Sequence, residues 1–169
     1  MNFTVKNERA ITIRGRVMIT DPCYFIEDND WQELCDIWYP PSNKYKGTEL
    51  SKACVVEYKG ARILIGTTAY GDGQYKVRGA GHFGVDAGCM CVVQVDELLA
   101  TGLEAVDEYS ATYLDVGPDP VIVTTDGKGR FEGAVHVDTT YEEENYDGDD
   151  ECDGSYEEEE EEEGDSTSK

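Results

Sequence analysis

The residues of this chain that could carry out chemistry are six cysteines, two histidines and several aspartates at turns. Cys89 and Cys91 are one residue apart, and residues i and i+2 of a strand face the same way. Together with Cys23 and His82, these two thiols could bind a zinc ion. Zinc sites usually have C-x₂₋₄-C spacing and a second matching pair, which is missing here. The spacing therefore favours packing of both cysteines as small buried side chains.

A thiol beside a histidine could also act as a nucleophile. Cys23 or Cys89 would supply the thiolate, and His82 or His136 would supply the base. Such a pair, or a bound metal ion, would make the protein a hydrolase. Nothing in the spacing brings a histidine to a thiol, so this is the third of three functional hypotheses.

Asp21, Asp72 and Asp86 each lie at a predicted turn, beside small residues. Carboxylates there could hold a divalent cation or exchange protons, but aspartate is also a common turn former. If the fold gathers them, Asp21, Tyr75, Arg78 and Asp86 would line a pocket for a small molecule or nucleotide. That arrangement would make the protein a sponge or sensor.

A calcium-like pattern occurs near the C-terminus. Asp149, Glu151, Asp153, Gly154 and Glu160 take positions 1, 3, 5, 6 and 12 of an EF-hand loop. Position 3 is Glu rather than Asp or Asn, and no amphipathic helix flanks the loop. We expect at most weak, nonspecific binding of divalent cations.

The charge of the chain is concentrated in its last 29 residues. Segment 141–169 has 16 acidic residues, one basic residue and no Leu, Ile, Val, Phe or Trp. Such a composition cannot offset the entropy of ordering, which predicts a disordered acidic tail. Residues 1–140 have a moderate acidic surplus and enough length to bury a core, which predicts one globular domain. The tail includes seven consecutive glutamates that could contact a basic partner: Glu157, Glu158, Glu159, Glu160, Glu161, Glu162 and Glu163.

The net charge of −23 argues against direct binding to nucleic acid or to an anionic membrane, because both would repel it. No apolar run approaches the roughly 20 residues of a membrane span. The N-terminus has no apolar stretch typical of a secretion signal. We therefore expect a cytoplasmic protein with reduced thiols.

Hydrophobic periodicity predicts an α+β, mainly β domain. Trp31, Leu34, Cys35 and Trp38 share one face of a helix over about 30–38, capped by Asn29 or Asp30. Short apolar runs between turn residues predict an antiparallel, hairpin-rich sheet or a partial barrel. The expected strands are 10–20 with a bulge at Gly15, 53–58, 61–70, 74–78, 83–85, 89–95, 121–125 and 130–137. A short helix is expected at 96–100 with Asp96 as its cap, and 102–120 has no clear pattern.

Three segments carry a resemblance to small uncharacterised proteins of bacteriophages and bacteria. They are Thr20-Asp21-Pro22-Cys23-Tyr24, Gly71-Asp72-Gly73-Gln74-Tyr75 and Phe83-Gly84-Val85-Asp86-Ala87-Gly88. The chain resembles that group over roughly residues 16–95. The resemblance implies a mostly β domain of phage or mobile-element origin, and it assigns no catalytic residue.

These features favour a non-enzymatic binding protein. Its acidic surface and tail would engage a basic protein surface, such as that of a nucleic-acid-binding host factor, as an inhibitor or a mimic of nucleic acid charge. The small-molecule sponge and the metal- or cysteine-dependent hydrolase are the alternatives. The sequence leaves the oligomeric state open.

Overall fold

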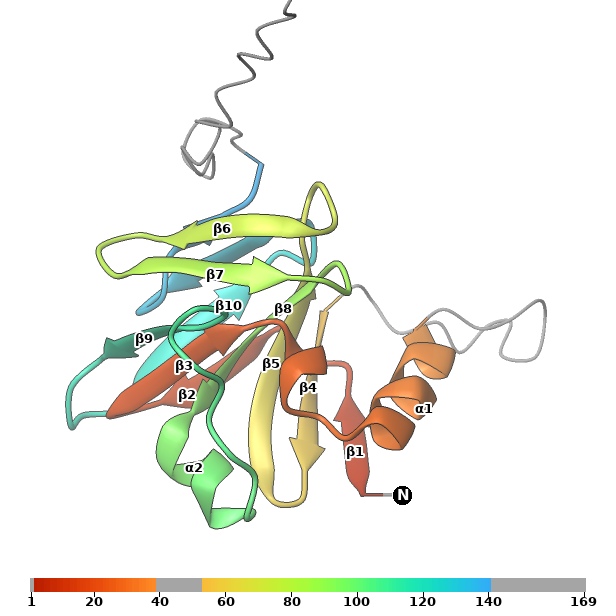
Figure 1. Ribbon diagram of the computed structural model, residues 1–169. Helices are drawn as coiled ribbons and strands as arrows, with labels where there is room; N and C mark the ends of the chain where they lie inside the picture. The colour runs from red at the N-terminus through yellow and green to blue at the C-terminus, as the bar shows by residue number, and fades with distance from the viewer. Residues whose placement is uncertain (1, 39–52, 141–169) are drawn as a thin grey trace, which may run out of the picture.

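A computed structural model describes residues 2–38 and 53–140 of the chain (Figure 1). The strands in chain order are β1 (Phe3–Lys6), β2 (Ala10–Ile13), β3 (Arg16–Thr20), β4 (Ala53–Tyr58), β5 (Ala61–Thr67), β6 (Gly73–Val77), β7 (Gly81–Val85), β8 (Cys89–Gln94), β9 (Thr112–Asp115), β10 (Val121–Thr125), β11 (Arg130–Gly133) and β12 (Val137–Asp138). A 3₁₀ turn, η1 (Pro22–Tyr24), and the helix α1 (Asp28–Trp38) follow β3, and the helix α2 (Val95–Ala100) follows β8.

The strands form two six-stranded sheets, and all their pairings are antiparallel. Sheet 1 has the order β1-β4-β5-β8-β3-β9, and sheet 2 has the order β2-β10-β11-β12-β6-β7. The predicted α+β, mainly β class is therefore confirmed. The expected antiparallel, hairpin-rich arrangement is also confirmed, and over the described residues it consists of two sheets that do not close into a barrel.

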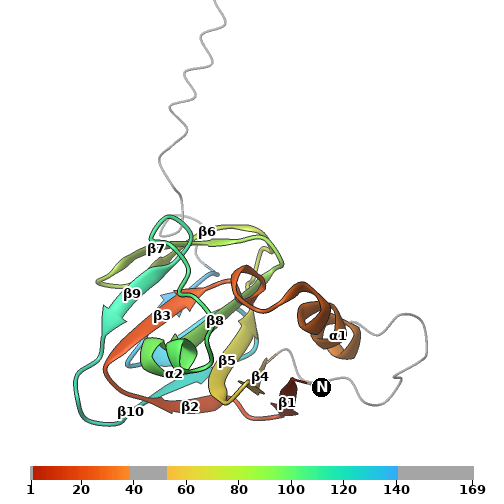
Figure 2. The same cartoon turned by 60° about the horizontal axis from the view of Figure 1, so that its bottom comes forward.

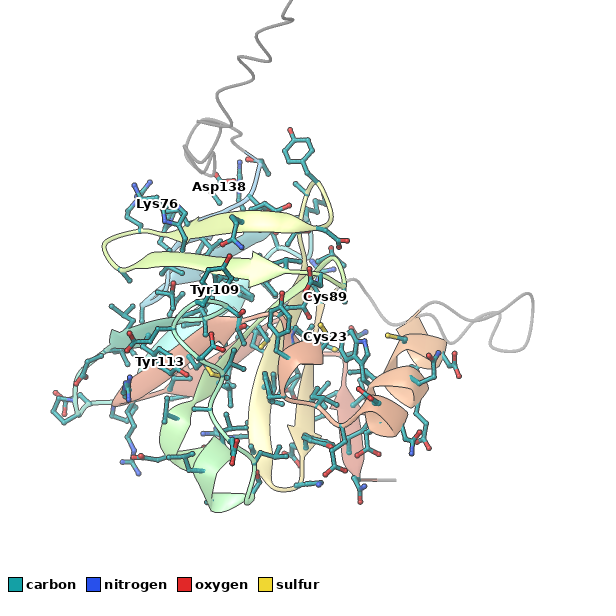
Figure 3. All side chains as sticks on the ribbon, in the orientation of Figure 1. Cys23, Lys76, Cys89, Tyr109, Tyr113 and Asp138 are labelled. Atoms are coloured by element: carbon teal, nitrogen blue, oxygen red, sulfur yellow. The ribbon has the colours of Figure 1, made fainter. Side chains whose placement is uncertain are left out.

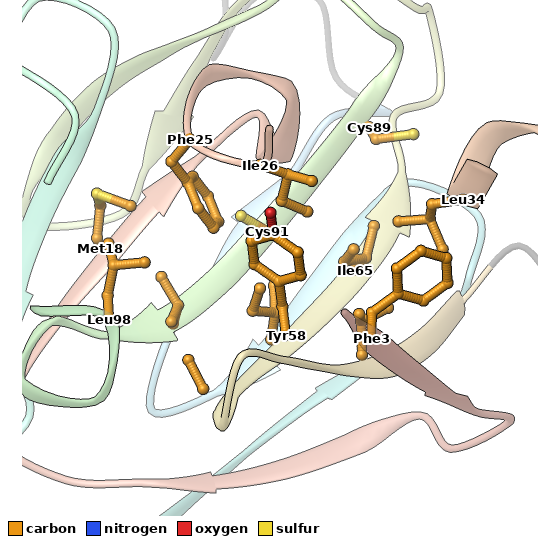
Figure 4. Packing of buried hydrophobic residues seen from close by; sticks show 14 of the residues in the cluster. Phe3, Met18, Phe25, Ile26, Leu34, Tyr58, Ile65, Cys89, Cys91 and Leu98 are labelled. Atoms are coloured by element: carbon orange, nitrogen blue, oxygen red, sulfur yellow. The ribbon is translucent and has the colours of Figure 1, made fainter. Parts of the chain in front are cut away.

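Sheet 1 is buried on both faces, and its side chains alternate between two cores. Along β8, Met90 and Val92 face sheet 2, whereas Cys89, Cys91 and Val93 face the other way. That second face is covered by two segments, 21–38 and 95–111, which we call the cover layer (Figure 2). Its apolar contributions to the core, several of them drawn in Figure 4, are Phe25, Ile26, Trp31, Leu34, Ile37, Val95, Leu98, Leu103, Val106 and Ala111.

Residues 10–20 form two strands in different sheets, so the prediction of one bulged strand was wrong. Gly15 has φ 69°, a left-handed conformation that glycine adopts without strain. Its amide donates to the Gly117 carbonyl, and its own carbonyl accepts from the Val116 amide. The chain therefore leaves sheet 2 after β2 and enters sheet 1 as β3.

The expected strands 53–58 and 61–70 are joined by a turn at Lys59-Gly60. Both residues have positive φ, 50° and 93°, as a type I′ hairpin turn requires. The helix α1 begins at Asp28, and Asp30 accepts hydrogen bonds from the Tyr58 hydroxyl at 2.7 Å and from the Asn2 side-chain amide. Gln94, rather than Asp96, occupies the cap position of α2.

The strands β1 and β9 were not anticipated. Each has only four residues, and each lies at an edge of sheet 1. None of the helices in the described ranges is long and apolar enough to span a membrane.

Candidate functional site

Asp21 is a fully buried carboxylate at the point where the two sheets and the cover layer meet. One of its oxygens accepts from the Cys23 amide at 2.9 Å, which caps η1. Its other oxygen accepts from the amides of Asp86 at 2.8 Å and Ala87 at 2.6 Å. Asp86 and Ala87 form the turn that carries the chain from β7 of sheet 2 into β8 of sheet 1. Asp21 thus fastens the start of the cover layer to a crossing between the sheets.

Burial raises the pKa of the Asp21 carboxyl, and the three amide donors act in the opposite direction. Because this pKa is raised in the folded state, the folded protein binds the proton more tightly than the unfolded chain does. The resulting stabilisation is complete below the ordinary aspartate pKa and is lost as the pH rises through the raised value. In the ionised form, the three amide hydrogen bonds offset part of the free-energy cost of burying the charge.

The three segments that carry the phage-protein resemblance contact one another at this crossing. The Tyr24 hydroxyl donates to the Asp86 carboxylate at 2.6 Å. The Thr68 hydroxyl donates to the Gly71 carbonyl at 2.6 Å, and the Thr68 amide donates to the Gly88 carbonyl. These contacts, with the pairing of Gly73–Tyr75 to Phe83–Val85, give the three segments a structural role in this chain.

The structure does not bring the four predicted pocket residues together into one pocket. Asp21 and Asp86 lie in contact. Tyr75 packs its ring in the core between the sheets and donates its hydroxyl to the Gly71 carbonyl at 2.8 Å. Arg78 is exposed at the opposite end of the β6–β7 hairpin, because Gly73 pairs with Val85 at one end and Val77 with Gly81 at the other. The hairpin register thus separates Arg78 from the two aspartates.

The thiols of the cover-layer side are shielded rather than activated. Cys54, Cys89 and Cys91 are buried, and Cys23 and Cys35 are half-buried. Figure 3 labels two of them, Cys23 and Cys89. Burial raises the pKa of Cys54 to about 12, and it raises those of the other four thiols as well. The Asp21 carboxylate adds to the rise at Cys23, Cys89 and Cys91. A reactive cysteine needs the opposite environment.

His82 lies away from the buried thiols, on the exposed side of β7. It lines an open cleft of about 240 Å³ together with Glu108 and Tyr113. No group of three or more His, Cys, Asp or Glu side chains within 2–38 and 53–140 is placed to hold a metal ion. The EF-hand-like pattern and the run Glu157–Glu163 lie outside the described residues.

The cover layer carries the negative surplus of the described residues. Segments 21–38 and 95–111 contain eleven acidic residues and no lysine or arginine. The remaining described residues contain nine acidic and ten basic residues. The sequence shows that the two segments contain no lysine or arginine. Only the fold shows that both segments cover the same face of sheet 1.

Some of these carboxylates have structural partners. Glu27 pairs with Lys59 at 2.8 Å and Glu97 with Arg62 at 2.6 Å, so both link the cover layer to the β4–β5 hairpin. Asp21 and Asp30 are buried. The other exposed carboxylates of the two segments are Asp28, Glu33, Asp96, Glu104, Asp107 and Glu108. Among them, Asp107 accepts hydrogen bonds from the amides of Tyr109 and Ser110. Sequence reasoning expected an acidic surface as well as an acidic tail, but it named only Glu157–Glu163 as partner-binding residues and did not single out these six.

We expect the same substitution to have opposite consequences at the two touching aspartates. Asp21→Asn replaces an acceptor oxygen by a donor that faces backbone N–H groups, and should lower the free energy of unfolding by about 2 kcal/mol or more. Asp86→Asn keeps an acceptor oxygen for the Tyr24 hydroxyl, so it should change the free energy of unfolding by less than about 1 kcal/mol. Urea unfolding of both variants measures the difference. Equal losses would contradict the role given to Asp21.

We expect the five thiols within the described residues to resist alkylation. Cys54, Cys89 and Cys91 should react with iodoacetamide only after unfolding, and Cys23 and Cys35 should react far more slowly than a free thiol, because burial disfavours their thiolates. Mass spectrometry of tryptic peptides during a labelling time course resolves each site. Rapid native labelling of Cys23 or Cys89 would instead support a nucleophilic cysteine.

Comparison with known proteins adds no assignment. No family model, no curated protein and no solved structure matches this chain. The resemblance to phage and bacterial proteins therefore stays a prediction. The arrangement of charge on the cover layer is the feature from which a function can be argued.

Proposed function

We propose that this protein is a non-enzymatic binding protein whose acidic cover layer and C-terminal segment engage a basic macromolecular surface. The observation that carries the proposal is the segregation of charge. Eleven acidic residues and no basic ones lie in the two segments that cover one face of sheet 1. The rest of the described body is nearly balanced.

The segregation of charge matters because a surface that carries only negative charge directs a basic partner to that face. Like charges gathered on one side produce a field that extends about 8 Å at physiological salt, and they orient an approaching basic surface before contact. Most apolar side chains of the same segments pack in the core, and the outward side carries the carboxylates together with the exposed side chains of Leu99 and Tyr109. Electrostatic association of this kind is fast, and added salt weakens it.

The C-terminal segment extends the same chemistry. Residues 141–169 add 16 acidic residues against one basic residue, and Glu157–Glu163 offer seven carboxylates in succession. In the proposal they raise the rate of encounter with the basic partner, while the cover layer supplies the fixed surface. In the proposal, the carboxylates of the cover layer and of the C-terminal segment bind where a nucleic-acid-binding protein would otherwise bind phosphates.

The resemblance to phage and bacterial proteins supports a setting for this activity. The protein would act in the cytoplasm of a bacterial host, on a host factor that binds nucleic acid. Its effect would be to inhibit that factor by competing with nucleic acid for the basic surface.

The test is a pull-down from bacterial lysate with two charge-matched variants. Glu33→Gln/Glu104→Gln/Glu108→Gln removes three exposed carboxylates from the cover layer, and Glu8→Gln/Asp119→Asn/Glu132→Gln removes three exposed carboxylates elsewhere. The wild-type chain should capture a nucleic-acid-binding protein that high salt and added duplex DNA both release. The cover variant should lose roughly tenfold or more in affinity for it, because three oriented contacts are lost.

The second variant should retain capture, because it removes the same number of negative charges without touching the cover layer. An equal loss of affinity in both variants would mean that binding depends on the net charge alone and not on the position of the carboxylates. Capture that neither salt nor DNA releases, or no capture of a nucleic-acid-binding protein, would contradict the proposal. A 1–140 truncation then measures what the C-terminal segment contributes.

A further inference from the structure

An open cleft lies where the two sheets and the cover layer adjoin. It is bounded by β7, an edge strand of sheet 2, by β9, an edge strand of sheet 1, and by the turn 107–110 of the cover layer. His82, Glu108 and Tyr113 contribute to its lining, and its volume is about 240 Å³. Figure 3 labels Tyr113 of this lining and Tyr109 of the adjoining turn. Drug-sized ligands occupy pockets of roughly 300 Å³ or more, so this cleft has the size for one side chain of a partner.

Hydrogen bonds hold the walls of the cleft together. The Thr112 hydroxyl of β9 donates to the His82 carbonyl of β7. The Tyr113 hydroxyl, which also belongs to β9, donates to the Val106 carbonyl of the cover layer. The three walls are thus joined to one another in the free protein, and the shape of the cleft does not depend on a ligand.

The turn beside the cleft presents an aromatic ring to solvent. Tyr109 is 88% exposed, the highest value among the large apolar and aromatic residues of the described part of the chain. Its backbone is nevertheless fixed, because the Asp107 carboxylate accepts from the amides of Tyr109 at 3.0 Å and Ser110 at 3.2 Å. In the sequence Tyr109 lies between Glu108 and Ala111, which both line the cleft. The ring is therefore held next to the cleft without being used in the core.

The charge at the cleft is negative in balance. The Glu108 carboxylate is exposed and has no hydrogen-bond or ion-pair partner within 2–38 and 53–140. The basic side chain on this side is that of Arg16, whose guanidinium lies 4.3 Å from the centroid of the Tyr113 ring. Arg16 pairs with Asp115 in the register of β3 and β9, so a carboxylate of its own lies beside it. The charges of Glu108 and Asp107 are left over.

One lysine lies on the other side of His82. Lys76 is the partner of His82 in the register of β6 and β7, and it lines a different pocket together with Asp138. This lysine is therefore also accompanied by a carboxylate, and it does not cancel the negative charge of Glu108.

A free carboxylate next to a free aromatic ring favours arginine as the occupant. A guanidinium can donate two parallel hydrogen bonds to a carboxylate, and its flat face stacks on aromatic rings. The ammonium of lysine is a compact charge without such a face. The contact of Arg16 with the Tyr113 ring shows the same pairing within this chain. Proteins that bind nucleic acid also stack arginine on exposed bases.

We propose that the cleft between β7 and β9 binds an arginine side chain of the basic partner, with Glu108 accepting from the guanidinium and the Tyr109 ring stacked on it. This inference rests on the proposed function and adds the kind of side chain that is recognised. The carboxylate takes the place of a phosphate, and the tyrosine ring takes the place of a base. The cleft then distinguishes arginine from lysine, which net charge alone does not do.

Two peptides of equal length and charge, one of Gly-Arg repeats and one of Gly-Lys repeats, test this preference. Calorimetric titration into the full-length chain should give a Kd for the arginine peptide roughly threefold or more below that for the lysine peptide. Tyr109→Leu should remove the difference. Tyr70→Leu, at a tyrosine that is 60% exposed and does not line the cleft, should keep it.

A second pair of variants separates the position of a carboxylate from its charge. Glu108→Gln should reduce the preference for arginine, because the guanidinium loses its acceptor at the cleft. Glu104→Gln removes an equal charge from the same segment and should weaken the binding of both peptides alike. In NMR spectra, the arginine peptide should shift the amide signals of His82 and Thr112.

Three results would overturn the proposal: equal affinity of the wild-type chain for the two peptides, no binding of either peptide, or a preference for arginine that survives Tyr109→Leu. The proposed function can stand after each of them, because the pull-down depends on the charge of the cover layer and not on a choice between arginine and lysine. Conversely, a preference for arginine at the cleft can stand if no nucleic-acid-binding protein is captured from the lysate.

Discussion

The buried carboxylate of Asp21 is the constraint on which the arrangement of this protein depends. It accepts three backbone N–H groups, one from the cover layer and two from the turn between β7 and β8. The Ser110 carbonyl lies at the same crossing, where it accepts from the Thr20 hydroxyl at 2.9 Å and from the Gly84 amide. Both segments of the cover layer are therefore tied to the place where the chain passes between the sheets. The three N–H groups offset part of the cost of burying this carboxylate, and the carboxylate in turn satisfies backbone donors that would otherwise be unmet.

The position of the cover layer determines where charge can accumulate. Sheet 1 has an apolar second face, and the two cover segments bury it with residues such as Leu34 and Leu98. Their outward side carries carboxylates without a compensating lysine or arginine. Electrostatic repulsion among these carboxylates opposes folding, and it is offset by the apolar burial beneath them and by ion pairs such as Glu97–Arg62. The surface proposed to bind a basic partner is thus a consequence of how the core is closed.

Local patterns predicted much of this fold. The Lys59-Gly60 hairpin, α1 and most strands follow from turn residues and from apolar spacing, which are short-range signals. The pairing of strands was not predictable in this way. Gly15 reads equally well as a bulge or as a crossing between sheets, and the four-residue strands β1 and β9 are too short to show a period.

The candidate site was predictable only in part for the same reason. Asp21 and Asp86 were singled out as turn residues, and their contact depends on the long-range docking of η1 on the β7–β8 turn. Arg78 is only eight residues from Asp86 in the sequence, but the hairpin register places it at the other end. The same-face placement of Cys89 and Cys91 follows from strand geometry, whereas their burial under the cover layer required the tertiary structure.

Hydrogen exchange at the amides of Asp86 and Ala87 tests the role of Asp21 most directly. Turn amides usually exchange rapidly, because local opening exposes them at little cost. If Asp21 holds the crossing as described, these two amides will exchange as slowly as those of the core strands β5 and β8. Exchange at the rate of unprotected amides would show that the carboxylate does not hold the turn, and would contradict the account of how the cover layer is fixed.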